Sequence, residues 1–414
     1  MSKKQSKPKI SYIVRRVHIG TSQQLQELSH ECGELYSKTL VFFWRTVRHK
    51  GLWLPPKLLM RLFTSPKLHA HTSDACVQAF CAALASWREL RHTDPNAKPP
   101  RRRRWYFRIE YKRSALSLQE GMLRLSNGRG NAPLLLPWSW DLPQTVVIRW
   151  TGSEYEALAT YAIGAPIMPE EEEEEPDYQA RRAEQSAGID LGEIHAAVSH
   201  DGHHTHIMNG RLLRSKRQYQ NKLKAELDGR IARKKPGSRR RKKLIRTKQK
   251  QLRKMKHQIK EVEHKLTSKL IGTLQREGVQ RLVIGDVRSI RKDLDVGSTN
   301  NQKLHQWSFG SVRHKLTYKA ERAGMRVILQ EERDTSRSCP VCGHRRKSKP
   351  RGRVFSCTNK TCQWSGHRDA VGAMNIRYKY RGEFGSPHVV GGMAPPIGCG
   401  YIPQLLCSSG ATVV

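Results

Sequence analysis

The sequence predicts a mixed α/β protein whose second half follows a recognisable order of elements. The elements expected there are a strand and hairpin (186–210), a basic helical region (211–277), a strand (281–287), a helix (303–323), a strand (325–332) and a short helix (368–380). Strand, hairpin, helix, strand, helix, strand, helix is the order of an RNase H-like fold. Its first strand lies centrally and the later strands lie parallel beside it.

The first half combines strands with an inserted helical segment. Residues 9–20 alternate as a strand does, and 105–165 return to short strands. The residues between them have apolar side chains at helical spacing, and the segment SDACVQAFCAALASWREL (73–90) starts on a Ser or Asp that can cap a helix. We therefore expect a β-rich module over 1–21 and 97–166, with a helical domain over 22–96 inserted into it.

Two segments are expected to lack regular structure. Residues 167–185 include six consecutive Glu between prolines, which repel one another and stay solvated. We interpret this segment as an acidic linker; the alternative is an acidic mimic that occupies a basic groove. Residues 383–414 are rich in Gly, Pro and Ser, and we expect a disordered tail there.

The 414 residues carry a formal net charge of +40 at pH 7. A compact chain with this charge repels itself unless a polyanion neutralises it, which favours a long phosphate-bearing partner over a small neutral substrate. A polybasic protein at a membrane surface is the alternative. The sequence has no apolar run of about 18 residues, no lipidation signal and no secretory signal peptide. We expect a cytoplasmic, nucleoid-associated protein of prokaryotic type.

Four of the nine cysteines form two knuckles, CPVC (339–342) and CTNKTC (357–362). Four thiolates in such pairs suit one tetrahedral Zn²⁺ with no open position, so we expect a structural zinc ribbon over 336–363. A redox C-x-x-C motif is the alternative, and the second pair at ribbon spacing argues against it. The expected ligands are Cys339, Cys342, Cys357 and Cys362.

Two acidic residues lie in motifs that allow catalysis. Asp190 lies inside the apolar strand GIDLG (188–192), where a carboxylate is costly to bury unless it is paired or bound to a cation. Asp369 lies at the start of the helix in GHRDAVGAMNI (366–376). Each has a structural alternative: Asp190 can make a turn hydrogen bond at the strand end, and Asp369 can complement the helix dipole.

The order of these motifs resembles that of the TnpB family of transposon-encoded RNA-guided nucleases, and compact type V CRISPR effectors are similar. The motifs are GIDLG, the basic helices, VIGDV, QWSFGSVRHKLTYKAERAG, TSRSCPVCG, the second cysteine pair and HRDAVGAMNI. The resemblance implies a RuvC nuclease domain over 186–335 and 364–382, interrupted by the ribbon. It also implies that the first half is a wedge β-barrel carrying a helical recognition lobe.

Members of that family cut double-stranded DNA next to a short flanking motif, directed by a guide RNA made from the transposon end of an insertion sequence. The resemblance implies phosphodiester hydrolysis with two Mg²⁺ ions held by carboxylates, Asp190 matching the family's first acid and Asp369 its last. The expected partners are guide RNA and target DNA, with no membrane, and a monomer is expected. A guided DNA-binding protein that does not cut, and a CRISPR effector of similar size, are the alternatives.

The family's middle acid is absent from its usual place. Gly285 stands where the family has Glu, and the side chain of Asp286 would point to the opposite face of the sheet unless a bulge intervened. The strand 325–332 should lie beside Gly285, about 4.8 Å away, and a glycine leaves room for a long side chain to lean across. We therefore expect Glu332 to complete the magnesium site, with Glu331 and Asp286 as alternates.

Basic runs provide the expected grips on guide RNA and on its duplex with the target. Trp105, Tyr106 and Phe107 directly follow one such run and are candidates for stacking on bases, although each alone is more often a core residue. The residues expected to bind nucleic acid are Arg101, Arg102, Arg103, Arg104, Lys234, Lys235, Arg239, Arg240, Arg241, Lys242, Arg246, Lys250, Arg253, Arg346 and Lys347.

Overall fold

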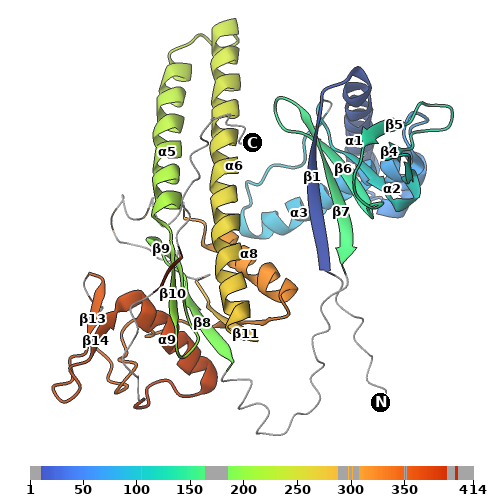
Figure 1. Cartoon of the computed structure of the whole chain (residues 1–414). Helices are drawn as coiled ribbons and strands as arrows, with labels where there is room; N and C mark the ends of the chain where they lie inside the picture. Colours follow the sequence, from blue (N-terminus) through green and yellow to red (C-terminus); the bar gives the residue numbers. More distant parts are fainter. Residues whose placement is uncertain are drawn as a thin grey trace, which may run out of the picture. The chain divides into compact units, whose positions relative to one another are not determined.

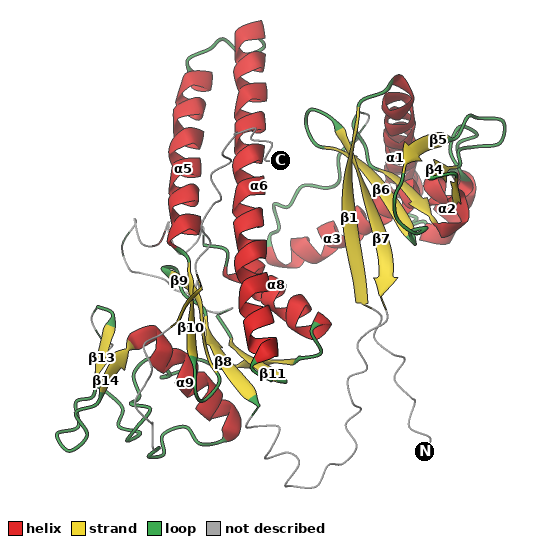
Figure 2. Cartoon of the chain, in the orientation of Figure 1, coloured by secondary structure: helices red, strands yellow, loops and turns green. Residues whose placement is uncertain are grey.

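The chain divides into two compact units, Met1–Ala165 and Pro166–Val414, whose elements are labelled in Figure 1. Figure 2 colours the helices and strands of each unit. The computed structural model describes residues 11–103, 105–163, 185–287, 297, 301, 307–348, 350, 352–388 and 397–399.

Unit 1 is built on a four-stranded antiparallel sheet of order β1-β7-β6-β2 and a three-stranded antiparallel sheet of order β3-β4-β5. The resemblance predicted a closed barrel. Among the described residues the larger sheet is open, with β1 and β2 as its edges, so a barrel is not confirmed. The elements are β1 Ser11–Gly20, β2 Ile109–Lys112, the 3-10 turn η1 Arg113–Ala115, β3 Leu116–Gln119, β4 Met122–Leu125, β5 Leu134–Pro137, β6 Thr145–Trp150 and β7 Tyr155–Ile163.

Three helices are inserted between β1 and β2: α1 Gln23–Lys50, α2 Pro56–Leu62 and α3 Ala70–Thr93. The side chain of Ser22 caps α1. The cap expected at Ser73 or Asp74 is wrong, because α3 begins at Ala70 with His69 as its N-cap residue. The helices do not form a lobe with a core of its own, because Phe43 and Phe80 share one apolar cluster with Tyr111 and Ile148 of the strands. The helical segment is therefore inserted in sequence but packed on the sheet.

Unit 2 is built on a six-stranded mixed sheet of order β12-β11-β8-β9-β10-β15. β9 and β10 follow β8 as antiparallel neighbours on one side, and β11 and β12 lie parallel to it on the other. This is the strand order predicted from the sequence for an RNase H-like fold. The strands are β8 Ser186–Asp190, β9 His195–His200, β10 Thr205–Asn209, β11 Arg281–Gly285, β12 Arg326–Gln330 and β15 Ile397–Cys399.

Helices cover both faces of this sheet, and successive side chains of β8 point to opposite faces and so contact different helices. Ala187 and Ile189 join the apolar cluster formed with α6 and α8. The opposite face meets α9, where a Cβ at Gly188 would lie only 2.2 Å from the Ala373 carbonyl oxygen, so the helix backbone sits directly on the strand. The helices of unit 2 are α5 Arg211–Ala232, α6 Arg239–Arg276, α8 Phe309–Arg322 and α9 Arg368–Arg381.

α5 and α6 form a long pair that extends away from the sheet (Figure 2), and the sequence KKPGS (234–238) forms the turn between them. The second half of α6 packs against the sheet through buried residues including Ile259, Val262, Leu266 and Leu270. The first half is dominated by Lys and Arg. One helix thus has an apolar end that anchors it and a basic end that projects.

The tail is partly ordered. β15 pairs in parallel with β10, with Ile397 opposite His206, and the His388 ring stacks on Tyr378 at 4.1 Å between centroids. The expected disorder therefore does not hold for 383–388 and 397–399, because these contacts fix them. Residues 164–184, nearly all of the predicted acidic linker, lie outside the described residues. No helix in the described part of the chain is long and apolar enough to cross a membrane.

Candidate active site

Three strands of unit 2 end at the same edge of the sheet. β8 ends at Asp190, β11 at Gly285 and β12 at Gln330, two residues before Glu332. Gly285 pairs with Gln330, so the ends of the two neighbouring strands are in register. Because the three strands are parallel, the residues that follow them gather at one edge.

Asp190 and Gly285 also share a face of the sheet. Ile189 pairs with Ile284, and both side chains are buried in the cluster with α6 and α8. Since successive side chains of a strand alternate, the next residues on both strands face α9.

The Glu332 side chain lies over Gly285. A Cβ at position 285 would be 1.9 Å from Glu332 Oε1, 2.6 Å from Cδ and 2.7 Å from Cγ, so the carboxyl group fills the space that glycine leaves. Asp190 fits against α9 in a similar way, because a Cβ at Gly372 would be 2.8 Å from Asp190 Oδ2. Two glycines therefore make room for two carboxylates.

Burial and neighbouring negative charges raise the pKa of both the Asp190 and the Glu332 carboxyl group. The pKa of Asp190 is raised to about 7, first by burial and then by the negative charge of Asp369. The pKa of Glu332 is raised to about 8, first by burial and then by Asp190 and Asp286. Glu332 Oε1 is buried and accepts no hydrogen bond from the described residues. Such a set of acids is stabilised by a bound cation.

Asp369 has the opposite environment. It lies in the first turn of α9, and its carboxylate is 2.8 Å from His195 Nδ1, 2.9 Å from a terminal nitrogen of Arg353 and 3.2 Å from Arg368 Nε. Burial by itself would raise the pKa of Asp369, but the hydrogen bond to His195 and the charges of Arg368 and Arg353 lower it. Asp369 therefore stays ionised beside two carboxyl groups that hold their protons more tightly.

His195 was not among the residues predicted from the sequence, and Arg353 was expected to face phosphates rather than to contact Asp369. A signal for His195 was present, because the hairpin between β8 and β9 returns the chain to the edge where Asp190 lies, only five residues later. Arg353 belongs to the basic segment between the cysteine pairs, but its sequence position does not indicate a contact with Asp369. It comes from the cysteine-rich segment and reaches Asp369 only through the fold.

The two alternate acids lie in different surroundings. The Asp286 carboxylate is 3.5 Å from a terminal nitrogen of Arg313 and close enough to Glu332 to raise its pKa. Glu331 is exposed, and its carbonyl oxygen accepts a hydrogen bond from Lys379. Asp286 is thus part of the acidic cluster, whereas the Glu331 side chain is in solvent.

The four predicted cysteine ligands converge beside the short strands β13 Val354–Ser356 and β14 Ser365–His367. The Sγ atoms are 3.9 Å apart for Cys339 and Cys362 and 3.6 Å apart for Cys342 and Cys357. Tetrahedral Zn²⁺ with bonds of about 2.3 Å separates sulfurs by about 3.8 Å, so the four thiols are placed as one zinc ion requires. Asn359 adds N–H donors to Cys357 and Cys342, as second-shell groups do.

Most of the predicted nucleic-acid contacts are exposed, and Arg104 lies outside the described residues. Arg241 and Lys234 are partly buried at the turn between α5 and α6, where the Arg241 guanidinium donates to the Lys234 carbonyl oxygen. Arg253 and Arg346 are also partly buried. The exposed residues are Arg101, Arg102, Arg103, Lys235, Arg239, Arg240, Lys242, Arg246, Lys250 and Lys347.

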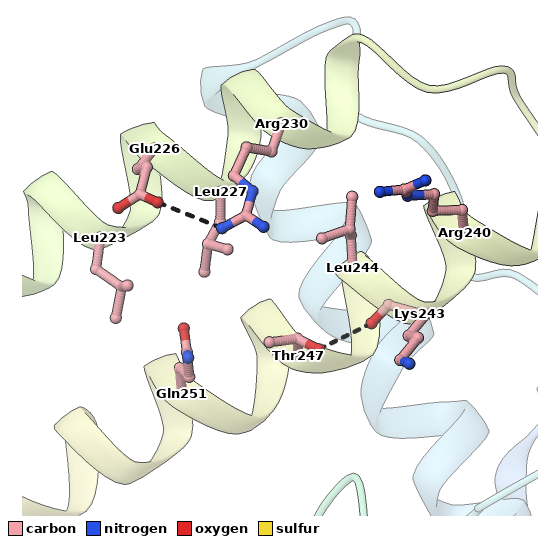
Figure 3. A pocket seen from close by; sticks show the side chains of 9 residues that line it. All are labelled: Leu223, Glu226, Leu227, Arg230, Arg240, Lys243, Leu244, Thr247 and Gln251. Carbon is pink, nitrogen blue, oxygen red and sulfur yellow. Dashed lines mark hydrogen bonds and ion pairs between the residues drawn. The ribbon is translucent and has the colours of Figure 1, made fainter.

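A hollow of about 390 Å³ lies between α5 and α6 (Figure 3). Its floor is apolar and its rim is basic, with one ion pair between Glu226 and Arg230 at 3.4 Å. The basic helices therefore offer a recess as well as a charged surface. The lining residues are Leu223, Glu226, Leu227, Arg230, Arg240, Lys243, Leu244, Thr247 and Gln251.

The three aromatic residues that follow the arginine run in unit 1 differ in how far their side chains are exposed. Trp105 is 64% exposed and Tyr106 is 52% exposed, and the Tyr106 ring stacks on Trp150 at 4.5 Å. Phe107 is buried against Tyr36 and cannot stack on a base. Phe107 lies two residues before Ile109 of β2 and is buried on the same side of the chain as Ile109 and Tyr111.

Two family models match unit 2. Residues 169–291 match the model described as a probable transposase, and residues 309–376 match the model described as Cas12f1-like, TNB domain. A TnpB-like protein, MJ0751 of Methanocaldococcus jannaschii, is 31% identical over 127 residues, which is 30% of this chain and 44% of that protein.

The chain is related to the TnpB proteins. It is also 26% identical over 207 residues to the CRISPR-associated endodeoxyribonuclease Cas12f1 of Sulfoacidibacillus thermotolerans, covering 49% of this chain and 47% of the nuclease. The chain thus spans about half the length of the curated relatives it matches. A cryo-EM structure of a Cas12f1–sgRNA–target DNA complex has a similar fold, with a TM-score of 0.51 and 12% identity over 86% of this chain and 83% of that one. The relation to TnpB predicted from the motifs is therefore confirmed.

Proposed function

We propose that this TnpB relative is an RNA-guided, Mg²⁺-dependent DNA endonuclease in which Asp190, Glu332 and Asp369 hold the metal ions. The position of Glu332 over Gly285 carries the proposal, because it supplies a third carboxylate at the edge where the usual acid is absent. The kinship with TnpB and Cas12f1 supports the reaction class. Cleavage of double-stranded DNA beside a flanking motif, as part of an insertion sequence, belongs to the same proposal.

The acid set fits Mg²⁺. Carboxylate oxygens are the ligands that this ion prefers, and Glu332 Oε1 is buried with no partner among the described residues. Burial, and after it the neighbouring negative charges, raise the pKa values of Asp190 and Glu332, and a bound divalent ion would favour their ionised forms. Two such ions, when bound, supply Lewis-acid activation of a phosphodiester and a nucleophilic hydroxide.

The residues around Asp369 hold it ionised and oriented. An ionised carboxylate only accepts hydrogen bonds, so His195 Nδ1 carries the proton it shares with Asp369 Oδ2. Arg353 and Arg368 approach the same carboxylate and bring positive charge to the edge where a scissile phosphate would lie. These three side chains position an acid and balance its charge.

Guide RNA and target DNA are the proposed partners. The net charge of +40 and the exposed basic residues of α6 favour a phosphate-rich partner. The hollow between α5 and α6 has an apolar floor and a basic rim, which suit an unpaired nucleotide (Figure 3). The four cysteines are proposed to bind one structural zinc ion, which holds the segment that delivers Arg353 to Asp369.

A cleavage assay tests the proposal. The ribonucleoprotein is purified with the RNA that the chain retains, and target duplexes with randomised flanking sequence are offered with Mg²⁺. We expect cutting by the wild type and loss of cutting, with retained DNA binding, in Asp190→Asn, Glu332→Gln and Asp369→Asn. Glu331→Gln is the matched control because Glu331 is the exposed neighbour of Glu332, and it should cut normally.

Two results would overturn the proposal. Loss of cutting in Asp286→Asn with normal cutting in Glu332→Gln would move the third metal ligand to Asp286. Guided binding by the wild type without nicking of either strand would instead identify a DNA-binding protein that does not cut. The absence of an acid at Gly285 is the observation that makes this second function worth testing.

A further inference from the structure

A group of metal-binding residue types lies in unit 2 outside the acidic edge. The turn between β9 and β10 has the sequence HDGHHTH (200–206). Ligand atoms of Asp201 and His204 from this turn, and of Glu277 from the end of α6, all lie within 4.8 Å of one another. The three residues come from segments about 70 positions apart, so the fold brings them together.

One carboxylate oxygen of Asp201 accepts hydrogen bonds from the backbone, and the other lies near the His204 ring. Asp201 Oδ1 accepts the backbone N–H groups of His203 at 2.7 Å and of His204 at 2.6 Å. Asp201 Oδ2 lies 3.5 Å from His204 Nδ1. Gly202, with a φ of +112°, makes the tight turn that places both side chains on one side. The pair is therefore preorganised by the backbone.

The Glu277 carboxylate is hydrogen-bonded to a buried histidine. Its Oε1 is 2.7 Å from Nε2 of His206, which is only 2% exposed. Glu277 also occupies the C-cap of α6, where the last carbonyl groups of the helix favour a positive charge. A ligating carboxylate that is hydrogen-bonded to a second-shell residue is the usual arrangement at protein metal sites.

The donor set selects the class of ion. One imidazole nitrogen and two carboxylate oxygens suit Zn²⁺ and neighbouring divalent transition metals, whereas Mg²⁺ prefers oxygen ligands alone. Ligands at about 2.1 Å from zinc are separated by about 3.4 Å, so small side-chain rotations bring the three atoms to bonding distance. The His204 side chain is half exposed, which leaves a fourth position open to water.

We propose that Asp201, His204 and Glu277 form a second transition-metal site, with Zn²⁺ as the ion their donors suit best. The bound ion would join the β9–β10 turn to the end of α6 and so tie the sheet to the helix that carries the basic surface. The Arg377 guanidinium lies near Gly202 of this turn and donates to the Ser186 carbonyl oxygen. This site does not depend on the proposed nuclease activity.

Metal stoichiometry tests the proposal on the full-length protein. Zinc is added to metal-free protein, excess ion is removed on a desalting column, and zinc per chain is measured by mass spectrometry. We expect two zinc ions in the wild type and one in His204→Ala. His203→Ala is the matched control, because His203 is the adjacent histidine outside the group, and it should retain two.

Two further variants keep the test independent of folding defects. Glu277→Gln should also bind one zinc ion, and His206→Gln should weaken the second ion by about 10- to 100-fold as loss of a second-shell partner does. Cobalt titration separates the two sites, since only the cysteine site gives thiolate-to-metal absorption, which should persist in all these variants. One zinc ion in the wild type overturns the proposal. Equal losses in His203→Ala and His204→Ala would show an adventitious ion only and overturn it as well.

Discussion

If the proposed nuclease function holds, Gly285→Ala is expected to remove most DNA cleavage without disturbing the fold. The new methyl group would lie 1.9 Å from Glu332 Oε1 and 2.6 Å from Cδ, where the carboxyl group now sits. Glu332 is a flexible side chain at a strand end, so it can swing away at little cost to stability. Its carboxylate would then leave the edge that it shares with Asp190.

The size of the effect follows from these distances. Real Cβ atoms do not approach neighbouring atoms closer than 3.0 Å, so the Glu332 carboxylate must move by about 1 Å or more. A displacement of about 1 Å at a catalytic group costs on the order of 100-fold in rate. That factor corresponds to about 2.7 kcal/mol of transition-state stabilisation.

Single-turnover cleavage by the purified ribonucleoprotein measures this loss, with DNA binding and melting temperature measured alongside. Gly272→Ala, a helical position where a Cβ meets nothing within 4 Å, is the control and should cut at the wild-type rate. Gly285→Glu combined with Glu332→Ala should recover part of the activity, because the acid returns from the neighbouring strand. Wild-type cleavage by Gly285→Ala would refute the role given to Glu332.

Glu332→Gln should raise the melting temperature of the metal-free protein near pH 8 but not near pH 4. The pKa of Glu332 is about 8 in the folded protein and 4.5 in its ordinary state. Between these two values the carboxyl group is ionised in the unfolded chain but protonated in the folded protein, so the wild type loses stability as the pH rises. Equal melting temperatures of the two proteins at pH 8 would contradict this reasoning. Glu263→Gln should lower the free energy of unfolding by about 3 kcal/mol, because it leaves Lys315, now 2.8 Å from the buried carboxylate, without its charged partner. Denaturant titration measures that loss, and an unchanged midpoint would show that the ion pair between Glu263 and Lys315 contributes little to stability. Cys357→Ser should release the proposed zinc ion of the cysteine site and make residues 336–363 sensitive to protease. A variant that keeps both its zinc and its protease resistance would contradict the assignment of four cysteine ligands.

Local patterns in the sequence were enough to predict several features of unit 2. The strand order follows from the succession of elements, because parallel strands joined by helices leave few arrangements. The cysteine pairs carry their own spacing, and all four sulfurs converge. Asp190 stood out because an acid inside an apolar strand is costly without a partner. Each of these features depends on residues close together in the sequence, so each could be predicted without the structure.

Contacts between distant segments were harder to predict. The helices of unit 1 share a core with the strands, and Phe107 points into that core, because burial depends on neighbours far along the chain. His195 and Arg353 meet at Asp369 only after a hairpin and the cysteine-rich segment have folded. The group of Asp201, His204 and Glu277 could not be predicted either, since about 70 residues separate Glu277 from the turn that holds the other two.

The sequence alone determined that Gly285 lacks the expected acid and that a glutamate on the next strand is within reach. Only the tertiary structure decided where the Glu332 carboxyl group lies: it occupies the volume of the missing Cβ, buried beside Asp190. The physical reason is that strand order is set by short-range pattern, whereas the direction of one long side chain is set by the space that its neighbours leave.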